Sequence, residues 1–230
     1  MSRQAGFGGL LARLGNLTGA VAALWIAQAA PAQAHPHVFI DLALKAEIAP
    51  SPQGGAQLMA VEVIWTFDEL YSFFSIEELP KLGPEQPDPD AVSQMADFAA
   101  EALEEWNYYL DLRRDDQRQE VGVVSDFTGV FENGRLIYSY RLPFPDPIVL
   151  EGSPLTLRIY DPVFYVAISP DPKGLSLSGA DLGCSLTLAP APGLSEEQTF
   201  MGMNLPEQDV APGEEGLGFP FAAPMILSCP

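Results

Sequence analysis

The chain is poor in histidine. Only two of its 230 residues are histidines, and both lie in one short stretch, at His35 and His37. A Ser-His-Asp or Cys-His arrangement would need that stretch to fold over a distant serine or cysteine. The sequence also contains no glycine-rich phosphate-binding loop. We therefore expect a protein that is not an enzyme.

Basic residues are scarce as well. The chain has 11 lysines and arginines against 31 aspartates and glutamates, and its formal net charge is −20 at pH 7. A chain with this balance repels nucleic acid and anionic lipid head groups, whereas it attracts cations and basic partners. We therefore exclude nucleic acid as a partner, and solubility outside the cell accounts for most of the charge.

Long apolar runs are missing except near the N-terminus. Residues 17–30 form an apolar stretch that follows two arginines and precedes an Ala-Gln-Ala sequence. This order is typical of a cleavable secretory signal peptide, and the apolar core is shorter than the ~20 residues of a membrane span. The sequence predicts a signal peptide over 1–34 and a periplasmic mature protein that begins at His35.

Cysteine is limited to Cys184 and Cys229. In an oxidising compartment a disulfide between them is the default expectation, and it would stabilise the fold by a few kcal/mol. Two free thiols, or a pair of ligands for a soft metal, are the alternatives.

Alternation of apolar and polar residues predicts strands along most of the mature chain. It is strict over 38–48 and 57–67, and the intervening residues are rich in proline and glycine, which predicts an antiparallel hairpin. Asn133-Gly134 is a strong turn signal for a second hairpin. The remaining strands are expected over residues 120–131, 135–142, 155–160, 163–169, 175–178 and 184–189.

One stretch follows a helical period instead. Apolar residues between Val92 and Leu110 fall on one face, which predicts a long packed helix over about 90–113, after a short helical turn over 75–82. The expected fold class is α+β and mostly β, with antiparallel sandwich-like or open-barrel sheets and this one long helix.

The composition also predicts how the chain is organised. We expect a single β-rich domain over 35–189 and an acidic segment, rich in proline and glycine and flexible, over 190–220. Residues 221–230 are apolar again, and a disulfide would attach them to the domain.

The sequence His35-Pro36-His37 suggests a metal site. Imidazole is a common ligand for Ni, Co, Zn and Cu, and a mature N-terminal His35 could chelate through its amine and its ring. Pro36 has no N–H, so the square-planar copper mode that uses backbone nitrogens is blocked. On a straight strand Asp41 lies about 13 Å from His37, too far to share one ion.

The register of the first hairpin indicates which carboxylates could complete that site. Matching the two apolar faces around the turn predicts that Val38 faces Phe67 and that His37 faces Asp68. Asp68 or Glu69 would then join the histidines as metal ligands. The alternative is that His37 only caps a strand by hydrogen-bonding a carboxylate.

Taken together, these motifs resemble the DUF1007 family. The motifs are the stretch 35–41 (HPHVFID), the sequence 65–72 (WTFDELYS), the triplet 160–162 (YDP) and the closing Cys229. The resemblance implies an exported bacterial protein, often labelled as the periplasmic component of an uncharacterised ABC-type transport system and often encoded beside nickel/cobalt-type transporters. The chain lacks the repeated βαβ units of two-lobed solute-binding proteins.

We therefore expect a periplasmic accessory or binding component of a transition-metal transport system, with a membrane transporter subunit and a metal ion as its partners. The alternative is a non-catalytic structural or interaction module that docks on such a transporter, with the histidines capping the edge of a sheet.

Overall fold

The computed structural model of the protein describes three stretches of the chain, which all belong to one compact unit, 34–230: residues 36–84, 86–192 and 210–230. The predicted signal peptide and His35 lie outside the described residues. No helix among the described residues is long and apolar enough to cross a membrane.

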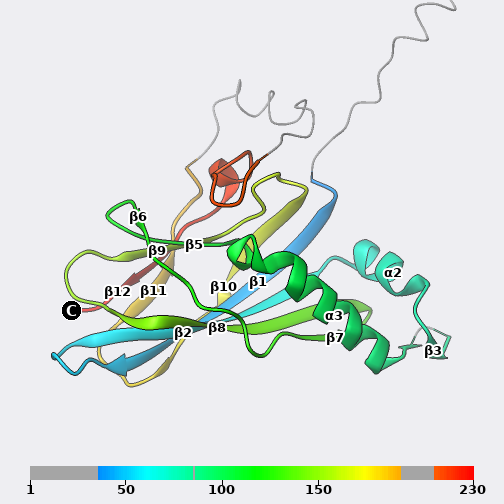
Figure 1. The fold of residues 1–230 in the computed structure, drawn as a ribbon, viewed down its shortest axis with the longest axis horizontal. Helices are drawn as coiled ribbons and strands as arrows, with labels where there is room; N and C mark the ends of the chain where they lie inside the picture. The colour runs from blue at the N-terminus through cyan, green and yellow to red at the C-terminus, as the bar shows by residue number, and fades with distance from the viewer. Residues whose placement is uncertain (1–35, 85, 193–209) are drawn as a thin grey trace, which may run out of the picture. The chain divides into compact units, whose positions relative to one another are not determined.

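Two five-stranded sheets form the body of the domain (Figure 1). The first sheet has the strand order β10-β1-β2-β8-β7: β10 (Val166–Gly179), β1 (Val38–Pro50), β2 (Ala56–Phe67), β8 (Arg135–Val149) and β7 (Thr128–Glu132). The second has the order β11-β12-β9-β5-β6: β11 (Ser185–Leu188), β12 (Met225–Ser228), β9 (Leu155–Ile159), β5 (Leu110–Arg114) and β6 (Gln117–Arg118).

The other elements are short strands and helices: α2 (Glu69–Glu77), β3 (Lys81–Gly83), β4 (Gln86–Pro87), α3 (Pro89–Glu104), and the 3-10 turns η1 (Asn107–Tyr109) and η2 (Phe219–Phe221). Apolar side chains from both large sheets contribute to one core. The predicted α+β, mostly β class is confirmed, and the sheets do not close into a barrel.

The period-two pattern gives β1 its two faces. Ile40, Leu42 and Leu44 are buried, while the residues between them face outward. On the outward face, Glu47 accepts a bidentate hydrogen bond from Arg141, with both distances 2.7 Å. This contact lowers the pKa of the Glu47 carboxyl against the opposing effect of its burial.

The observed register of the β1–β2 hairpin differs from the predicted one by two residues. Phe67 pairs with Ile40, not with Val38. The difference arises partly because the ladder is irregular between Glu47 and Ile48, where Met59 is an extra residue on β2. As a result Asp68 lies beside Phe39 and does not face His37.

The long helix is shorter than predicted. It begins at Pro89, after an N-cap in which the Asp88 side chain accepts a bond from the Asp90 N–H, but it ends at Glu104 and not near Arg113. Three consecutive residues, 107–109, have φ between 51° and 61°, which is left-handed backbone that an α-helix cannot include. The chain beyond them pairs with β9 as strand β5.

The bounds of other helices and strands also differ from the predicted ones. Helix α2 starts directly after β2, so the predicted helical turn over 75–82 began too late. Only the last four residues of the predicted strand 120–131 are strand, because β7 covers residues 128–132. The strand predicted over 135–142 is longer in the structure: β8 continues through three prolines to Val149, with an irregular register against β2.

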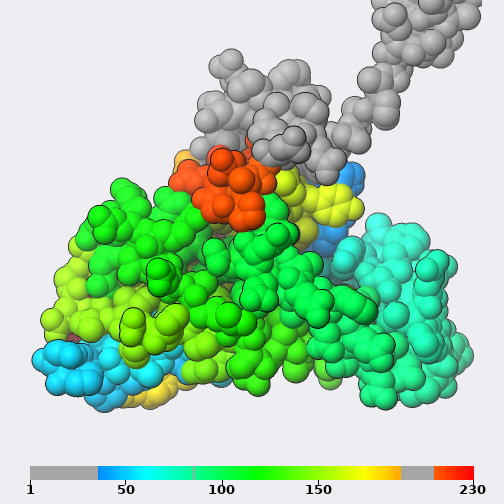
Figure 2. Space-filling model, in the orientation of Figure 1, coloured from blue at the N-terminus to red at the C-terminus, as the bar shows by residue number. Residues whose placement is uncertain are grey.

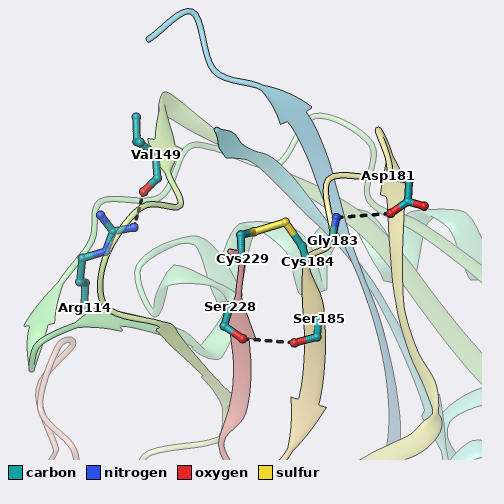
Figure 3. The surroundings of a disulfide bond; sticks show 8 residues. All are labelled: Arg114, Val149, Asp181, Gly183, Cys184, Ser185, Ser228 and Cys229. Atoms are coloured by element: carbon teal, nitrogen blue, oxygen red, sulfur yellow. Dashed lines mark hydrogen bonds between the residues drawn. A yellow bond between two sulfur atoms is a disulfide. The ribbon is translucent and has the colours of Figure 1, made fainter. Parts of the chain in front are cut away.

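The disulfide between Cys184 and Cys229 is present and joins the neighbouring strands β11 and β12 (Figure 3). Next to it, the hydroxyls of Ser185 and Ser228 lie 3.1 Å apart. The predicted disulfide between these two cysteines is therefore confirmed.

Part of the predicted flexible segment lies against the second sheet. Among the residues described from 210 onward, Glu215 forms an ion pair with Arg113 at 2.9 Å, and the Gly213 carbonyl accepts a bond from Arg118 at 2.9 Å. Residues 193–209 of the same segment lie outside the described part of the chain.

Candidate functional site

Motifs that are far apart in the sequence meet where β1 begins. The backbone N–H of His37 donates to the Tyr165 carbonyl at 2.9 Å, and Val38 pairs with Val166 at the start of β10. The buried Asp161 accepts bonds from the N–H groups of Val163 at 3.0 Å and Val166 at 2.9 Å. The stretch 160–162 therefore shapes the turn that leads into β10. Strand β10 then pairs with β1, which carries most of the stretch 35–41.

Asp68 connects the second motif, residues 65–72, to the first motif, residues 35–41. Its backbone N–H donates to the Phe39 carbonyl at 2.8 Å, and its Oδ2 accepts from the Phe39 N–H at 2.9 Å. Its Oδ1 accepts from the Tyr71 N–H at 2.8 Å, which caps the N-terminus of α2. Both carboxylate oxygens of Asp68 thus bind backbone groups.

These contacts also set the ionisation of Asp68. Partial burial of the carboxyl opposes its negative charge, but the N–H groups of Tyr71, Phe39 and Leu70, together with the charge of Arg135, outweigh that effect and lower its pKa. The carboxylate is therefore ionised near neutral pH and acts as the cap of α2.

Ser72 fixes the same helix from its buried side. The Ser72 side chain is fully buried, its hydroxyl donates to the Asp68 carbonyl at 2.6 Å, and it accepts from the N–H of Leu136 on β8 at 2.9 Å. A hydroxyl in this position satisfies a strand N–H that would otherwise be buried without a partner. Asp68 and Ser72 together hold α2 against β1 and β8.

The predicted metal ligands are only partly brought together. His37 is exposed, and its ring centroid lies 4.9 Å from that of Tyr165. Glu69 is exposed in the first turn of α2, next to Asp68, and His35 is outside the described residues. In the described ranges, no three His, Cys, Asp or Glu side chains gather in a group able to hold a metal ion.

A cluster of aromatic residues lies behind this corner. Trp65 stacks on Tyr109 with ring centroids 6.0 Å apart, and Phe67 stacks on Tyr71 at 4.9 Å. Burial raises the pKa values of the Tyr109 and Tyr138 hydroxyls, and the charge of Asp161 raises that of Tyr109 further. These hydroxyls therefore stay neutral, which suits packing and not proton transfer.

The outward side of α2 is apolar, which the sequence analysis missed. Leu70, Phe73 and Phe74 on the helix and Leu82 on β3 are between 54% and 68% exposed. In Figure 2 the residues of α2 and β3 project at the right of the domain. The sequence carries no clear signal for this arrangement, because apolar residues lie on both sides of the helix: Ile76 is buried, whereas Phe73 and Phe74 are exposed.

The exposed side of α2 borders a groove of about 660 Å³. The groove lies between α2, β3 and the turn that joins β7 to β8, and it is lined by Glu69, Leu70, Phe73, Ile76, Lys81, Pro84, Phe131, Asn133 and Gly134.

The family model of DUF1007, described as a protein of unknown function, matches residues 20–229. The chain belongs to the DUF1007 family. No curated protein matches the chain. Within this DUF1007 protein, Asp68 and Ser72 of the second motif have a structural role, because they position α2 and leave its apolar side facing outward.

Proposed function

We propose that this DUF1007 protein is a non-catalytic interaction module that docks on a membrane transporter subunit in the periplasm. The observation that carries the proposal is the contrast between the two sides of α2. Its inner side is held against β8 by the buried hydroxyl of Ser72, and its N-terminus is capped by Asp68. On its outer side Phe73 and Phe74 are more than half exposed.

The exposed aromatic side chains suit a docking role. Contiguous apolar patches on a protein surface mark sites of interaction, and aromatic residues contribute much of the binding energy at interfaces. Because α2 is anchored on both β1 and β8, its outer side is presented in a fixed orientation, which lowers the entropy cost of binding.

The choice of a transporter as partner comes from the family resemblance. That resemblance links proteins of this kind to export and to nickel/cobalt-type transporters. The disulfide between Cys184 and Cys229 supports an oxidising compartment, since such bridges are rare in the cytosol.

Sedimentation with membranes tests the docking proposal. We expect the mature protein to co-sediment with membrane vesicles from its native host and not with liposomes made from the extracted lipids. The variant Phe73→Ser/Phe74→Ser should lose at least about tenfold in affinity, as expected for interface aromatics. Phe98→Ser is the matched control, because Phe98 is 72% exposed but lies on α3.

Two outcomes would contradict the proposal. Binding that is equally strong on liposomes would mean that no membrane protein is involved. Binding by the Phe73→Ser/Phe74→Ser variant that matches the unmodified protein would mean that α2 is not the docking element.

Transition-metal handling is a second proposal, favoured by the position of His37. His37 and Glu69 are both exposed and lie within two residues of the Asp68–Phe39 pair, at one corner of the domain. Together with the predicted N-terminal His35, they offer imidazole and carboxylate ligands that suit Ni, Co or Zn, and Cu in a mode without backbone nitrogens. The metal would be cargo delivered to the transporter.

Calorimetric titration separates the two proposals. Mass spectrometry first establishes whether the exported protein begins at His35. Ni²⁺, Co²⁺, Zn²⁺ and Cu²⁺ are then added to this protein, to His35→Ala/His37→Ala, and to Asp41→Asn as a control. Metal handling requires binding that the double variant loses and the control keeps; absent or equal binding would leave only the docking role.

A further inference from the structure

We infer that the groove between α2, β3 and the β7–β8 turn binds an apolar segment of the partner protein whose flanks carry lysine or arginine. This inference rests on the proposed docking function and specifies its partner. It is carried by two features of the same surface, an apolar floor and an acidic rim.

The floor of the groove is formed by side chains from three elements. Leu70, Phe73 and Ile76 come from α2, Pro84 follows β3, and Phe131 comes from β7. A volume of about 660 Å³ is large enough for several side chains of an incoming segment. Spaced apolar anchors on a helix or an extended chain fit such a groove.

The rim is acidic. Glu69 itself lines the groove, and Glu77, Glu78 and Glu132 lie within two residues of the lining residues Ile76 and Phe131 in the sequence. All four glutamates are exposed, and none forms an ion pair with a described residue. Lys81 supplies the only positive charge among the described residues that line the groove.

This charge selects among the possible occupants. A second copy of the chain would bring two acidic rims together across a two-fold interface, and like charges there cost free energy. An anionic membrane surface is repelled in the same way. A segment with basic flanks would be attracted by the four glutamates, which form no ion pair with a described residue. Its positive charge would also raise the rate of association with a chain of net charge −20.

Two labelled synthetic peptides test the inference. Both are amphipathic helices of about 14 residues with the same leucine pattern, and their polar positions are either all lysine or all glutamate. Fluorescence anisotropy measures their binding to the mature protein. We expect the lysine peptide to bind, with an affinity that falls as salt rises, and the glutamate peptide not to bind.

Paired variants locate the binding. Phe73→Ser and Glu69→Gln/Glu77→Gln should each weaken binding of the lysine peptide by about tenfold. The matched controls Phe98→Ser and Glu101→Gln/Glu104→Gln make the same chemical changes on the exposed surface of α3 and should leave binding unchanged. All these positions are exposed, so the fold is retained.

Four results would overturn the inference. The first is an equal loss of binding in the α3 controls, which would show attraction by overall charge alone. The second is binding of both peptides. The third is a dimer of the protein that Phe73→Ser dissociates, and the fourth is binding to phosphatidylglycerol vesicles. If native membranes still bind through Phe73 and Phe74 while the lysine peptide does not, only the basic partner is wrong. If both fail, the docking function falls as well.

Discussion

Asp68 and Phe39 exchange two hydrogen bonds, one from each backbone N–H, at 2.8 and 2.9 Å. The Asp68 N–H binds the Phe39 carbonyl, and the Phe39 N–H binds the Asp68 carboxylate. This exchange extends the β1–β2 ladder by one position beyond Phe67 and joins it directly to the first turn of α2. Replacing the carboxylate therefore affects a strand and a helix together.

The first prediction concerns Asp68→Ala. We expect a loss of about 1 to 2 kcal/mol in the free energy of unfolding at neutral pH, because an N-cap bond and a strand bond disappear. The folded-state pKa of Asp68 is below its ordinary value of 3.8, so the ionised carboxylate stabilises the fold above that value. The difference between the variant and the unmodified protein should shrink as the pH falls through the lowered folded-state pKa.

Urea unfolding, followed by circular dichroism at neutral pH and in acid, measures this difference. Glu69→Ala is the control, because Glu69 is the exposed neighbour and caps no helix. A destabilisation of Asp68→Ala that stays constant across the acid range would contradict the role of its charge.

The second prediction concerns Ser72→Ala. The change removes the bond to the Asp68 carbonyl and leaves the buried N–H of Leu136 without its acceptor. We expect a loss of about 1 to 3 kcal/mol, the cost of an unsatisfied buried donor. Ser75→Ala, a half-buried serine on the same helix, should change the free energy of unfolding by much less. Equal effects of the two variants in urea unfolding would refute the assignment.

The third prediction concerns Gly129→Ala. A Cβ atom at this β7 position would lie 2.7 Å from the Cβ of Ala96 and 3.0 Å from the ring of Tyr138, so α3 would have to shift away from the sheet. We expect a loss of about 1 to 3 kcal/mol from overpacking. At Gly83 the nearest atom is 3.7 Å away, so Gly83→Ala is the control. Thermal unfolding that ranks the two variants equally would argue against this close contact.

The fourth prediction concerns the disulfide. Cys184 and Cys229 are 45 residues apart, so the bridge restricts the unfolded chain, and Cys184→Ser/Cys229→Ser should lose about 3 to 4 kcal/mol. A reducing agent should lower the melting temperature of the unmodified protein to a similar extent and leave that of the variant unchanged. An unmodified protein that is insensitive to reduction would show that the bridge adds little.

The strands of the first sheet were predictable because burial on one face imposes alternation. Leu42 and Leu44 are buried and Ala43 is not, and this contrast is visible in the sequence alone. The exact register was not predictable, because the extra residue Met59 leaves no signal in the alternation. The end of α3 was missed for a related reason: Leu110 fits a helical spacing from Leu103 and also a strand spacing to Leu112.

The candidate site was predicted only in part. The pattern of two histidines and the resemblance to DUF1007 pointed to the corner where β1 begins, and the structure places Asp68 and Glu69 at that corner. The role of Asp68 as a cap depends on Phe39, which is 29 residues away and reaches it only in the folded protein. The outward side of α2 was missed because its residues do not segregate into one apolar and one polar face.

The pairing of β1 with β10 has a consequence for how the chain folds. Among the strand pairs that the structure describes, this one alone is parallel, and it joins Val38 to Val166. Contacts between such distant parts of a chain close large loops and slow the folding transition. The first sheet is therefore completed only after β10, which ends at Gly179, has been synthesised.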